Sequence, residues 1–464
     1  MTDGIVDELR GIKLGDKRLN DRSAELMTAL AANPQASINA ACGGWAETKA
    51  AYLFFDNERV TPEKLLAPHR DATVLRMRQY PVVLVAQDTT ELDYTKHPPK
   101  DAGCLNTDKR FGLYHHVHLA ITPDKLPLGV LGTESFDRTP ESLGKSAERK
   151  SLPIEEKESF RWLEGYRLAC QMAQECPETQ IINVADREAD IYDIYLEAQE
   201  QRQKLGAQSA DYIIRVKEER CTLERDRESG PKAYHKVRAK VRGSDLKARI
   251  QIELPRTPKR EARLATLDVR AIRVTVKPPH ARSDLAPVTV NVVLVEEVGG
   301  PDDGTRVSWL LITTVSIDTV DEVLRVLKYY TARWGIEIYF RTLKTGCRVE
   351  AMQLDTTARL ENALAFYNII AWRIVYLTYL NRECPDLPCT AMFDDAEWKS
   401  VWRVVKKQSL PSSPPTLSEM MRLVAELGGH NNRASDRPAG PECIWMGLRR
   451  TIDFATAWQT FGPE

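Results

Sequence analysis

The sequence lacks the features that mark a secreted, disulfide-stabilised or membrane-spanning protein. Its nine cysteines are an odd number and form no CxxC pair, which disfavours a disulfide framework or a zinc ribbon and indicates reduced thiols. The start, MTDGIVDELRG, has no basic segment followed by an apolar core, so no signal peptide is expected. The most apolar stretch, 363–380, is interrupted by Asn368 and Arg373, which favours a buried helix over a membrane span. These absences predict a cytoplasmic protein without a membrane partner.

The chain also lacks an overall excess of charge. It contains 65 Lys and Arg against 66 Asp and Glu, so nucleic-acid binding would have to depend on local patches. One such patch spans 211–290, which contains twenty Lys and Arg and eleven Asp and Glu, a local excess of nine positive charges. By itself this patch is better explained as a solvated sheet with lysine on its edges than as a DNA-binding surface.

The hydrophobic pattern changes from helical to strand-like near residue 81. The first helices have clear boundary signals, with Asp16 as an N-cap, Pro34 as a stop and Thr61 before Pro62 as a second start. After residue 81 the apolar runs predict three strands, a helix, a strand, a helix and a strand. This order predicts an α/β fold with a mixed sheet. The later alternating segments predict a β-rich insertion, which is followed by helices to the end of the chain.

Two aspartates stand where predicted strands end. Asp88 ends VVLVAQD and Asp186 ends IINVAD, and the ends of neighbouring core strands present functional groups to a cleft. Glu337, on a later predicted helix, would complete a three-carboxylate site. Converging carboxylates repel one another unless cations are present, and oxygen ligands without His or Cys favour Mg²⁺ or Mn²⁺. Taken singly, the aspartates are better explained as turn caps, and Glu337 as an ion-pair partner of Arg333 and Arg341.

The segment YYTARWGIEIYFRTLK, residues 329–344, is predicted as one continuous helix. At about 100° per residue, one carboxylate, three cations and one phenol fall within an arc of roughly 80°. They are Tyr330, Arg333, Glu337, Arg341 and Lys344. Ion pairs between residues four apart explain the glutamate and its two arginines but leave the phenol and the lysine unexplained. A metal-binding glutamate flanked by groups that bind a DNA backbone accounts for all five.

The spacing Y-x2-R-x3-E-x6-K in this segment resembles the YREK signature of bacterial DDE cut-and-paste transposases of the insertion-sequence-four family, transposon-five type. The segments QDTT at Asp88 and ADREAD at Asp186 match the other two acidic motifs of that family. The motifs occur in the family's order, and the resemblance extends from LGDKRLNDR to the C-terminal helices.

The resemblance implies an RNase H-like core of class α/β, interrupted by a β-rich insertion. Residues 1–80 are then expected to form a helical domain that recognises DNA ends. Residues 81–217 and 304–380 are expected to form the two parts of the catalytic core, and 218–303 the basic insertion. Residues 381–464 are expected to form a helical dimerisation region.

The resemblance also implies an enzyme that acts on double-stranded DNA. A homodimer would bind two transposon ends, cleave them through hairpin intermediates and join the 3′ ends to target DNA in the bacterial cytoplasm, at the nucleoid. Asp88, Asp186 and Glu337 would be catalytic and would hold two Mg²⁺ ions, with Mn²⁺ as an alternative.

Further DNA contacts follow from the same resemblance. Trp309 matches a position whose indole stacks on a flipped base, a contact worth roughly 1–3 kcal/mol, although a core tryptophan on a strand is the simpler explanation of the residue alone. The remaining implied contacts are basic or phenolic: Tyr330, Arg333, Arg341 and Lys344 in the signature, Arg187, Arg215 and Lys217 near the cut strand, and Arg18 and Arg22 at the end sequence.

Other interpretations remain open from sequence alone. A repurposed homologue that binds DNA without cutting it, or a metal-dependent nuclease without strand transfer, would carry the same motifs. The histidines of LYHHVHLAIT, His115, His116 and His118, are better explained by packing than by zinc binding, because too few ligands accompany them.

Overall fold

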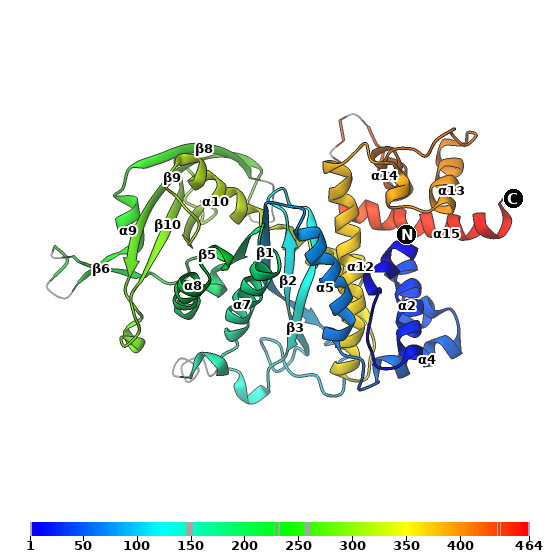
Figure 1. Ribbon diagram of the computed structural model, residues 1–464, viewed down its shortest axis with the longest axis horizontal. Coiled ribbons are helices and arrows are strands. Elements are labelled where there is room, and N and C mark those ends of the chain that lie inside the picture. Colours follow the sequence, from blue (N-terminus) through cyan, green and yellow to red (C-terminus); the bar gives the residue numbers. More distant parts are fainter. Residues whose placement is uncertain are drawn as a thin grey trace. The chain divides into compact units, whose positions relative to one another are not determined.

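The computed structural model describes residues 2–144, 152–226, 228–230, 233–254, 256, 260–433, 435–436 and 438–462. The chain divides into two compact units, which are described separately. Unit 1 contains Met1–Met77, Thr89–Ser146 and Trp334–Glu464, and unit 2 contains Arg78–Asp88 and Ala147–Arg333. Figure 1 labels many of the elements of both units.

Unit 2 is built on a mixed β-sheet. The strand order is β1-β4-β5-β11-β10-β9-β6-β7, and β8 pairs with β9. Strands β1, β4 and β5 are parallel, whereas β11, β10 and β9 follow in antiparallel pairs. The strand bounds are β1 Val82–Asp93 (shared with unit 1), β4 Gln180–Ala185, β5 Asp211–Arg215, β6 Cys221–Arg225, β7 Tyr234–Lys236, β8 Leu246–Leu254, β9 Arg263–Val276, β10 Val288–Glu297 and β11 Ser308–Thr313.

Helices α7 Phe160–Glu175, α8 Tyr192–Leu205 and α10 Val320–Ala332 cover the parallel strands, whose apolar runs are buried as expected for strands covered on both faces. Helix α9 Val237–Arg242 packs against β9 and β10. Trp162 and Tyr166 on α7 are buried, and α7 packs against β4. Helix α10 begins with a capping box between Thr319 and Glu322 and packs against β4 and β5. The predicted order of strands and helices in this region is confirmed.

Strands of the predicted β-rich insertion continue the core sheet. Strand β10 pairs with β11 from Asn291 opposite Thr313 to Glu296 opposite Ser308, and β9 pairs along the other side of β10. Buried residues alternate with mostly half-buried ones along β9, so one of its faces is buried more deeply than the other.

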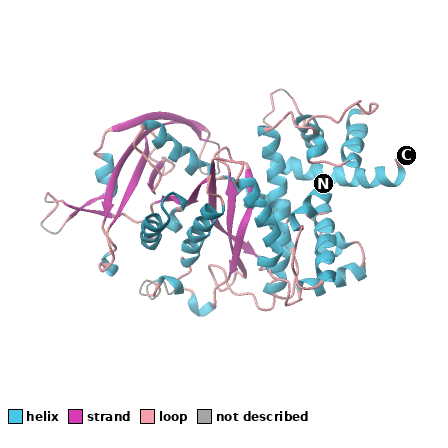
Figure 2. Cartoon of the chain, viewed as in Figure 1, coloured by secondary structure: helices cyan, strands magenta, loops and turns pink. Residues whose placement is uncertain are grey.

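Unit 1 is mostly helical, with a hairpin of two antiparallel strands (Figure 2). Its elements are α1 Thr2–Val6, α2 Lys17–Ala32, α3 Ile38–Cys42, α4 Trp45–Phe55, α5 Pro62–Met77, β2 Gly112–Ile121, β3 Pro127–Phe136, α11 Gly335–Arg341, α12 Thr357–Glu383, α13 Asp395–Lys406, α14 Leu417–Leu427 and α15 Pro441–Phe461. The predicted helix signals are confirmed, because Asp16 caps α2 and Pro62 is the first residue of α5.

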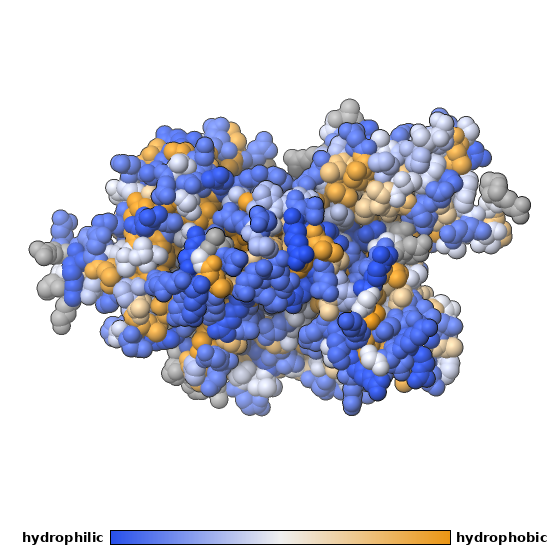
Figure 3. All heavy atoms as spheres, in the orientation of Figure 1, coloured by the Kyte–Doolittle hydropathy of each residue, from blue (hydrophilic) through white to orange (hydrophobic). Residues whose placement is uncertain are grey.

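Helix α12 is the central helix of unit 1. It is long and apolar enough to cross a membrane by length and composition, but 94% of its apolar window is buried inside the protein. Trp372 donates to the carbonyl of Pro127 at 2.7 Å, and Asn362 donates to the carbonyl of Phe55 at 2.9 Å. The helix therefore packs on β3 and on the N-terminal helices, as predicted for a buried helix. On the face in Figure 3, hydrophilic residues predominate and apolar residues form scattered groups.

The histidines of β2 are buried in unit 1 and make hydrogen bonds within the protein. His115 lies 3.2 Å from Asn368 on α12, and His116 lies 2.8 Å from the hydroxyl of Thr89. Burial lowers the pKa of His115 and of His118 to about 4, which keeps both imidazoles neutral at pH 7. The contacts agree with the packing role predicted for these side chains.

A buried polar cluster ties the N-terminal turn to α5. Glu8 accepts from His69 at 2.5 Å and from Arg76 at 2.8 Å, while the other ring nitrogen of His69 accepts from the backbone N–H of Val130 at 2.9 Å. Burial alone would raise the pKa of Glu8, but the hydrogen bonds from His69 and Arg76 outweigh it and lower the pKa to about 2. The carboxylate is thus stabilised in its charged form.

This cluster should make unit 1 sensitive to acid. Because the pKa of Glu8 is lower in the folded than in the unfolded chain, its contribution of up to about 3 kcal/mol is fully present above pH 4.5 and is lost as the pH falls towards 2. In thermal unfolding scans, Glu8→Gln should be less stable at pH 7 and should show a flatter loss of stability below pH 4.5. The exposed neighbour Asp7 gives the control Asp7→Asn, which should follow the wild-type curve. Equal acid sensitivity of Glu8→Gln and wild type would contradict the assignment.

Candidate active site

Two of the predicted catalytic aspartates are neighbours on adjacent parallel strands of unit 2. The pairing of β1 with β4 runs from Val82 opposite Gln180 to Ala86 opposite Val184. Continuing this register by two residues sets Asp88 beside Asp186, with the strands about 4.8 Å apart. Residues two apart on a strand share a face, so the two carboxylates project to the same side.

The side chain before Asp88 identifies the face that the carboxylates occupy. Gln87 points the other way and donates to the carbonyl of Trp162 on α7 at 3.3 Å and to Asn183 at 2.9 Å. Asp88 and Asp186 therefore face away from α7, towards α10. Arg215 on β5 follows the residue paired with Ala185 and joins them on this face.

Arg333, directly after α10, contacts the first of these carboxylates. Its Nη1 lies 2.6 Å from Oδ2 of Asp88, and the two side chains are 7% and 20% exposed. The sequence spacing had suggested Glu337 as a partner of Arg333, and within unit 2 the structure shows Asp88 as a partner of this guanidinium.

Tyr330, one turn before Arg333, lies on the same face. Burial raises the pKa of its phenol, an effect that nearby Arg333 and Arg215 reduce. Its ring meets the indole of Trp309 edge to face, with ring centres 5.7 Å apart, and both side chains are buried. The predicted site residues Asp88, Asp186, Arg215, Trp309, Tyr330 and Arg333 thus share one face of the unit 2 sheet.

The loop after Asp186 is held by a carboxylate to which the sequence had assigned no role. Asp186 caps a short turn by accepting from the backbone of Glu188 at 2.8 Å, so the turn-cap explanation also holds for this residue. Asp190, the last acid of ADREAD, is only 1% exposed and accepts from the backbone N–H groups of Lys217 and Glu218 at 2.8 and 3.0 Å. Arg220 also donates to it, at 2.8 Å through Nε.

Asp190 therefore fixes the segment after β5, which carries the predicted DNA contact Lys217 and directly follows Arg215 at the end of the strand. Lys217 is exposed, and so is Arg187 in the turn after Asp186. The signal for Asp190 was present in the sequence as the repeated acid of ADREAD, but only the structure shows which distant groups it holds.

The expectation of one continuous signature helix was wrong. Helix α10 ends at Ala332 in unit 2, α11 begins at Gly335 in unit 1, and a π-helical turn, Thr342–Gly346, follows. Uniform spacing of 100° per residue does not hold across these changes of hydrogen bonding. A β-carbon added to Gly335 would meet only Ile121 at 3.7 Å, an ordinary contact, so close packing does not require this glycine.

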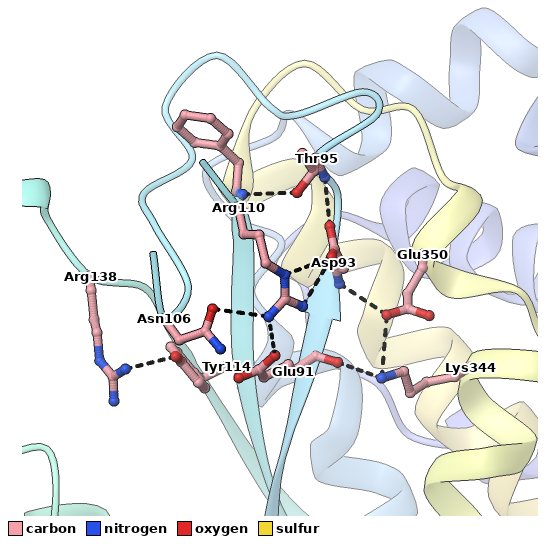
Figure 4. A network of polar contacts seen from close by, with 10 residues as sticks. Glu91, Asp93, Thr95, Asn106, Arg110, Tyr114, Arg138, Lys344 and Glu350 are labelled. Carbon is pink, nitrogen blue, oxygen red and sulfur yellow. Dashed lines mark hydrogen bonds and ion pairs between the residues drawn. The ribbon is translucent and has the colours of Figure 1, made fainter. Parts of the chain in front are cut away.

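Lys344 belongs to a polar network in unit 1 (Figure 4). Its ammonium group donates to the carbonyl of Glu91 at 2.7 Å and lies 3.3 Å from the carboxylate of Glu350. Glu350 also accepts from the backbone of Asp93 at 3.0 Å, and Arg110 donates to Asp93 at 3.0 Å and to Glu91 at 2.9 Å. The sequence had given no reason to connect these groups with the signature lysine.

The remaining predicted contacts lie on the surface of unit 1. Glu337 and Arg341 are exposed on α11. On α2, Arg18 is 91% exposed and pairs with Asp16, and Arg22 lies 2.8 Å from Glu25. The structure does not test the DNA-binding role of any of them.

The donor chemistry of the paired aspartates fits a hard divalent cation, because both supply carboxylate oxygen. Asp88 and Asp186 belong to unit 2 and Glu337 belongs to unit 1. Within the described ranges, no cluster of three or more His, Cys, Asp or Glu side chains is placed to hold a metal ion. The three-residue metal site therefore stays a prediction.

Comparison with protein families matches three parts of the chain. Residues 1–60 match a transposase DNA-binding domain, residues 168–373 a transposase DDE domain, and residues 369–459 the Tn5 transposase dimerisation domain. The chain belongs to the Tn5-type DDE transposases. The match to the DDE domain contains Asp186 and Glu337, whereas Asp88 precedes it.

The domain matches give this DDE transposase three general properties. It binds DNA, it has a nuclease and transposase domain of a class that uses divalent metal ions, and it forms homodimers. The dimerisation match runs from the second half of α12 through α15. The DDE domain also implies the RNase H-like core expected from the sequence. The parallel strands of unit 2 and the helices that cover them agree with such a core.

Proposed function

We propose that this transposase cleaves DNA at the ends of a mobile element by metal-dependent phosphodiester hydrolysis and hairpin formation, and joins the 3′ ends to target DNA. The observation that carries the proposal is the parallel register of β1 on β4 as far as Ala86 opposite Val184, because its continuation by two residues brings Asp88 beside Asp186 on one face of the sheet. Two carboxylates at the ends of adjacent parallel strands, with cationic side chains on the same face, suit a phosphodiester substrate.

Asp88, Asp186 and Glu337 would hold two Mg²⁺ ions, with Mn²⁺ as a substitute. When bound, these ions would activate a water or hydroxyl and stabilise charge on the leaving oxygen. The carboxylates orient the reacting region, while Arg215 and Arg333 bind the phosphates that flank it. Lys344 and Arg341 bind the DNA backbone further along, and Lys217 and Arg187 bind the strand being cut.

End recognition is assigned to the N-terminal helices, where Arg18 and Arg22 contact DNA phosphates. Two protomers bridge two ends in a synaptic complex before target DNA is engaged. The protein works in the bacterial cytoplasm at the nucleoid. The proposal includes the five domains predicted from the sequence, with the bounds and roles given there.

An assay with paired element-end duplexes and Mg²⁺ tests the proposed chemistry. Hairpins and joined products are expected if the proposal holds. Linear cuts alone would instead identify a nuclease without strand transfer, and bound but uncut DNA would identify a repurposed binding protein.

Trp309 is proposed to stack on the base that is flipped out during hairpin formation. Its indole already packs edge to face on Tyr330, on the same face of the sheet as the aspartates. Trp309→Ala should slow hairpin formation by about 5-fold to 150-fold, since base stacking is worth roughly 1–3 kcal/mol. The first nick should be affected less. Gel analysis of nicked and hairpin products over time measures both steps, and equal slowing of the two would remove the special role of the tryptophan.

A further inference from the structure

Arg333 pairs with the same carboxylate that is proposed to bind metal. We propose that Arg333 hinders metal binding at Asp88 in the DNA-free protein by its ion pair with this carboxylate, which we call the Arg333 guard. A DNA phosphate then draws the guanidinium away from Asp88, so that DNA and divalent cations bind cooperatively. This inference rests on the proposed function of Asp88 as a metal ligand and adds a regulation of that site.

The contact is a short, charge-assisted hydrogen bond between two largely buried groups. Nη1 of Arg333 lies 2.6 Å from Oδ2 of Asp88. The guanidinium keeps its positive charge at every physiological pH, so this partner cannot be removed by deprotonation. A divalent cation on the same oxygen would lie within a few ångströms of that fixed charge and would be repelled by it. Metal binding at Asp88 is therefore weakened as long as Arg333 stays on this carboxylate.

The neighbouring aspartate gives the guard a second effect. Asp88 and Asp186 lie side by side, and two adjacent carboxylates repel one another unless a cation neutralises them. Arg333 supplies that positive charge when no metal is bound. The guanidinium thus stabilises the pair in the DNA-free protein and competes with the metal for it.

A DNA phosphate is the anion suited to draw the guanidinium away. Arginine binds phosphate through two parallel hydrogen bonds, and Arg215 presents a second cation on the same face. Once Arg333 binds the phosphate, the oxygen of Asp88 is open to a divalent cation. Linkage then requires reciprocity: DNA raises metal affinity by the same factor by which metal raises DNA affinity.

Mn²⁺ binding, followed by the electron paramagnetic resonance signal of the free ion, tests the guard directly. An element-end duplex cut beforehand at the scissile phosphate supplies DNA without a cleavage reaction, and Mn²⁺ bound by the duplex alone is subtracted. Wild type should bind Mn²⁺ at least about fivefold more tightly with the duplex than without it. Arg333→Gln should bind tightly without DNA and gain little from it.

Two controls accompany this titration. Arg325 lies on α10, the helix that Arg333 follows, is 55% exposed and pairs with Glu322, so Arg325→Gln makes the same change of charge away from Asp88 and should behave as wild type. Asp88→Asn should abolish the binding gained with DNA.

The outcomes separate failure of the guard from failure of the site. If Arg333→Gln binds Mn²⁺ as weakly as wild type without DNA, while wild type with DNA still depends on Asp88, the guard is wrong and the metal site stands. If Asp88→Asn changes nothing in the DNA complex, both proposals are overturned. Circular dichroism shows whether Arg333→Gln folds. If it does not, the affinity of the wild-type protein for the duplex is measured with and without Mn²⁺. An affinity that does not rise with Mn²⁺ overturns the guard.

Discussion

Replacing Asp186 by asparagine is expected to lower the rate of end cleavage at least about a thousandfold. Asparagine keeps the size of the side chain and still accepts the hydrogen bond from the backbone of Glu188, so the turn should remain folded. It loses the negative charge that a divalent cation requires. Asp88→Asn and Glu337→Gln should have the same effect for the same reason.

Separate measurements of binding and cutting check this expectation. Mobility-shift titration should show end binding by Asp186→Asn close to that of wild type, while product gels with Mg²⁺ show no nick. Glu188→Gln is the matched control, because Glu188 is 59% exposed beside Arg161 and has no proposed contact with metal or DNA. Normal nicking by Asp186→Asn would exclude the residue as a metal ligand.

Asp190→Ala is expected to destabilise unit 2 by about 3–5 kcal/mol, because it leaves the charge of Arg220 without its buried partner. Asp190 is 1% and Arg220 10% exposed, and Tyr195 donates a further hydrogen bond to Asp190 at 2.6 Å. The backbone of Lys217 and Glu218 also loses its acceptor. The segment that follows β5 should therefore loosen together with its DNA contacts.

Denaturant unfolding followed by tryptophan fluorescence measures this loss. Glu200→Ala provides the comparison, since Glu200 is 64% exposed on α8 and its pair with Lys204 is worth about 0.3–0.5 kcal/mol. A loss for Asp190→Ala as small as that of Glu200→Ala would show that the buried cluster does not hold the loop.

Two cations of the signature are engaged by carboxylates within their own units. Arg333 pairs with Asp88 in unit 2, and Lys344 lies beside Glu350 in unit 1. A phosphate that binds either cation must replace an existing ion pair, so the net gain is smaller than that of a solvated cation. This competition favours DNA over a single anion, because one DNA molecule can replace several carboxylate partners at the same time.

The sequence by itself determined the local structure and the identity of the chemical groups. Apolar periodicity predicted the strands that end at Asp88 and Asp186, and the residues at helix starts predicted α2 and α5, because these signals depend on neighbours within a few positions. The spacing of the acidic motifs and the YREK signature identified the transposase family before any contact was known.

Only the tertiary structure decided which of these groups meet. The register of β1 on β4 set Asp88 beside Asp186, and Arg333, which follows the end of α10 at Ala332, contacts Asp88 from a segment far away in the chain. The same holds for Lys344 with Glu350, and for the insertion strand β10, which continues the core sheet. Strand register and the choice of ion-pair partner depend on the packing of segments far apart in the chain, and a local sequence pattern does not determine that packing.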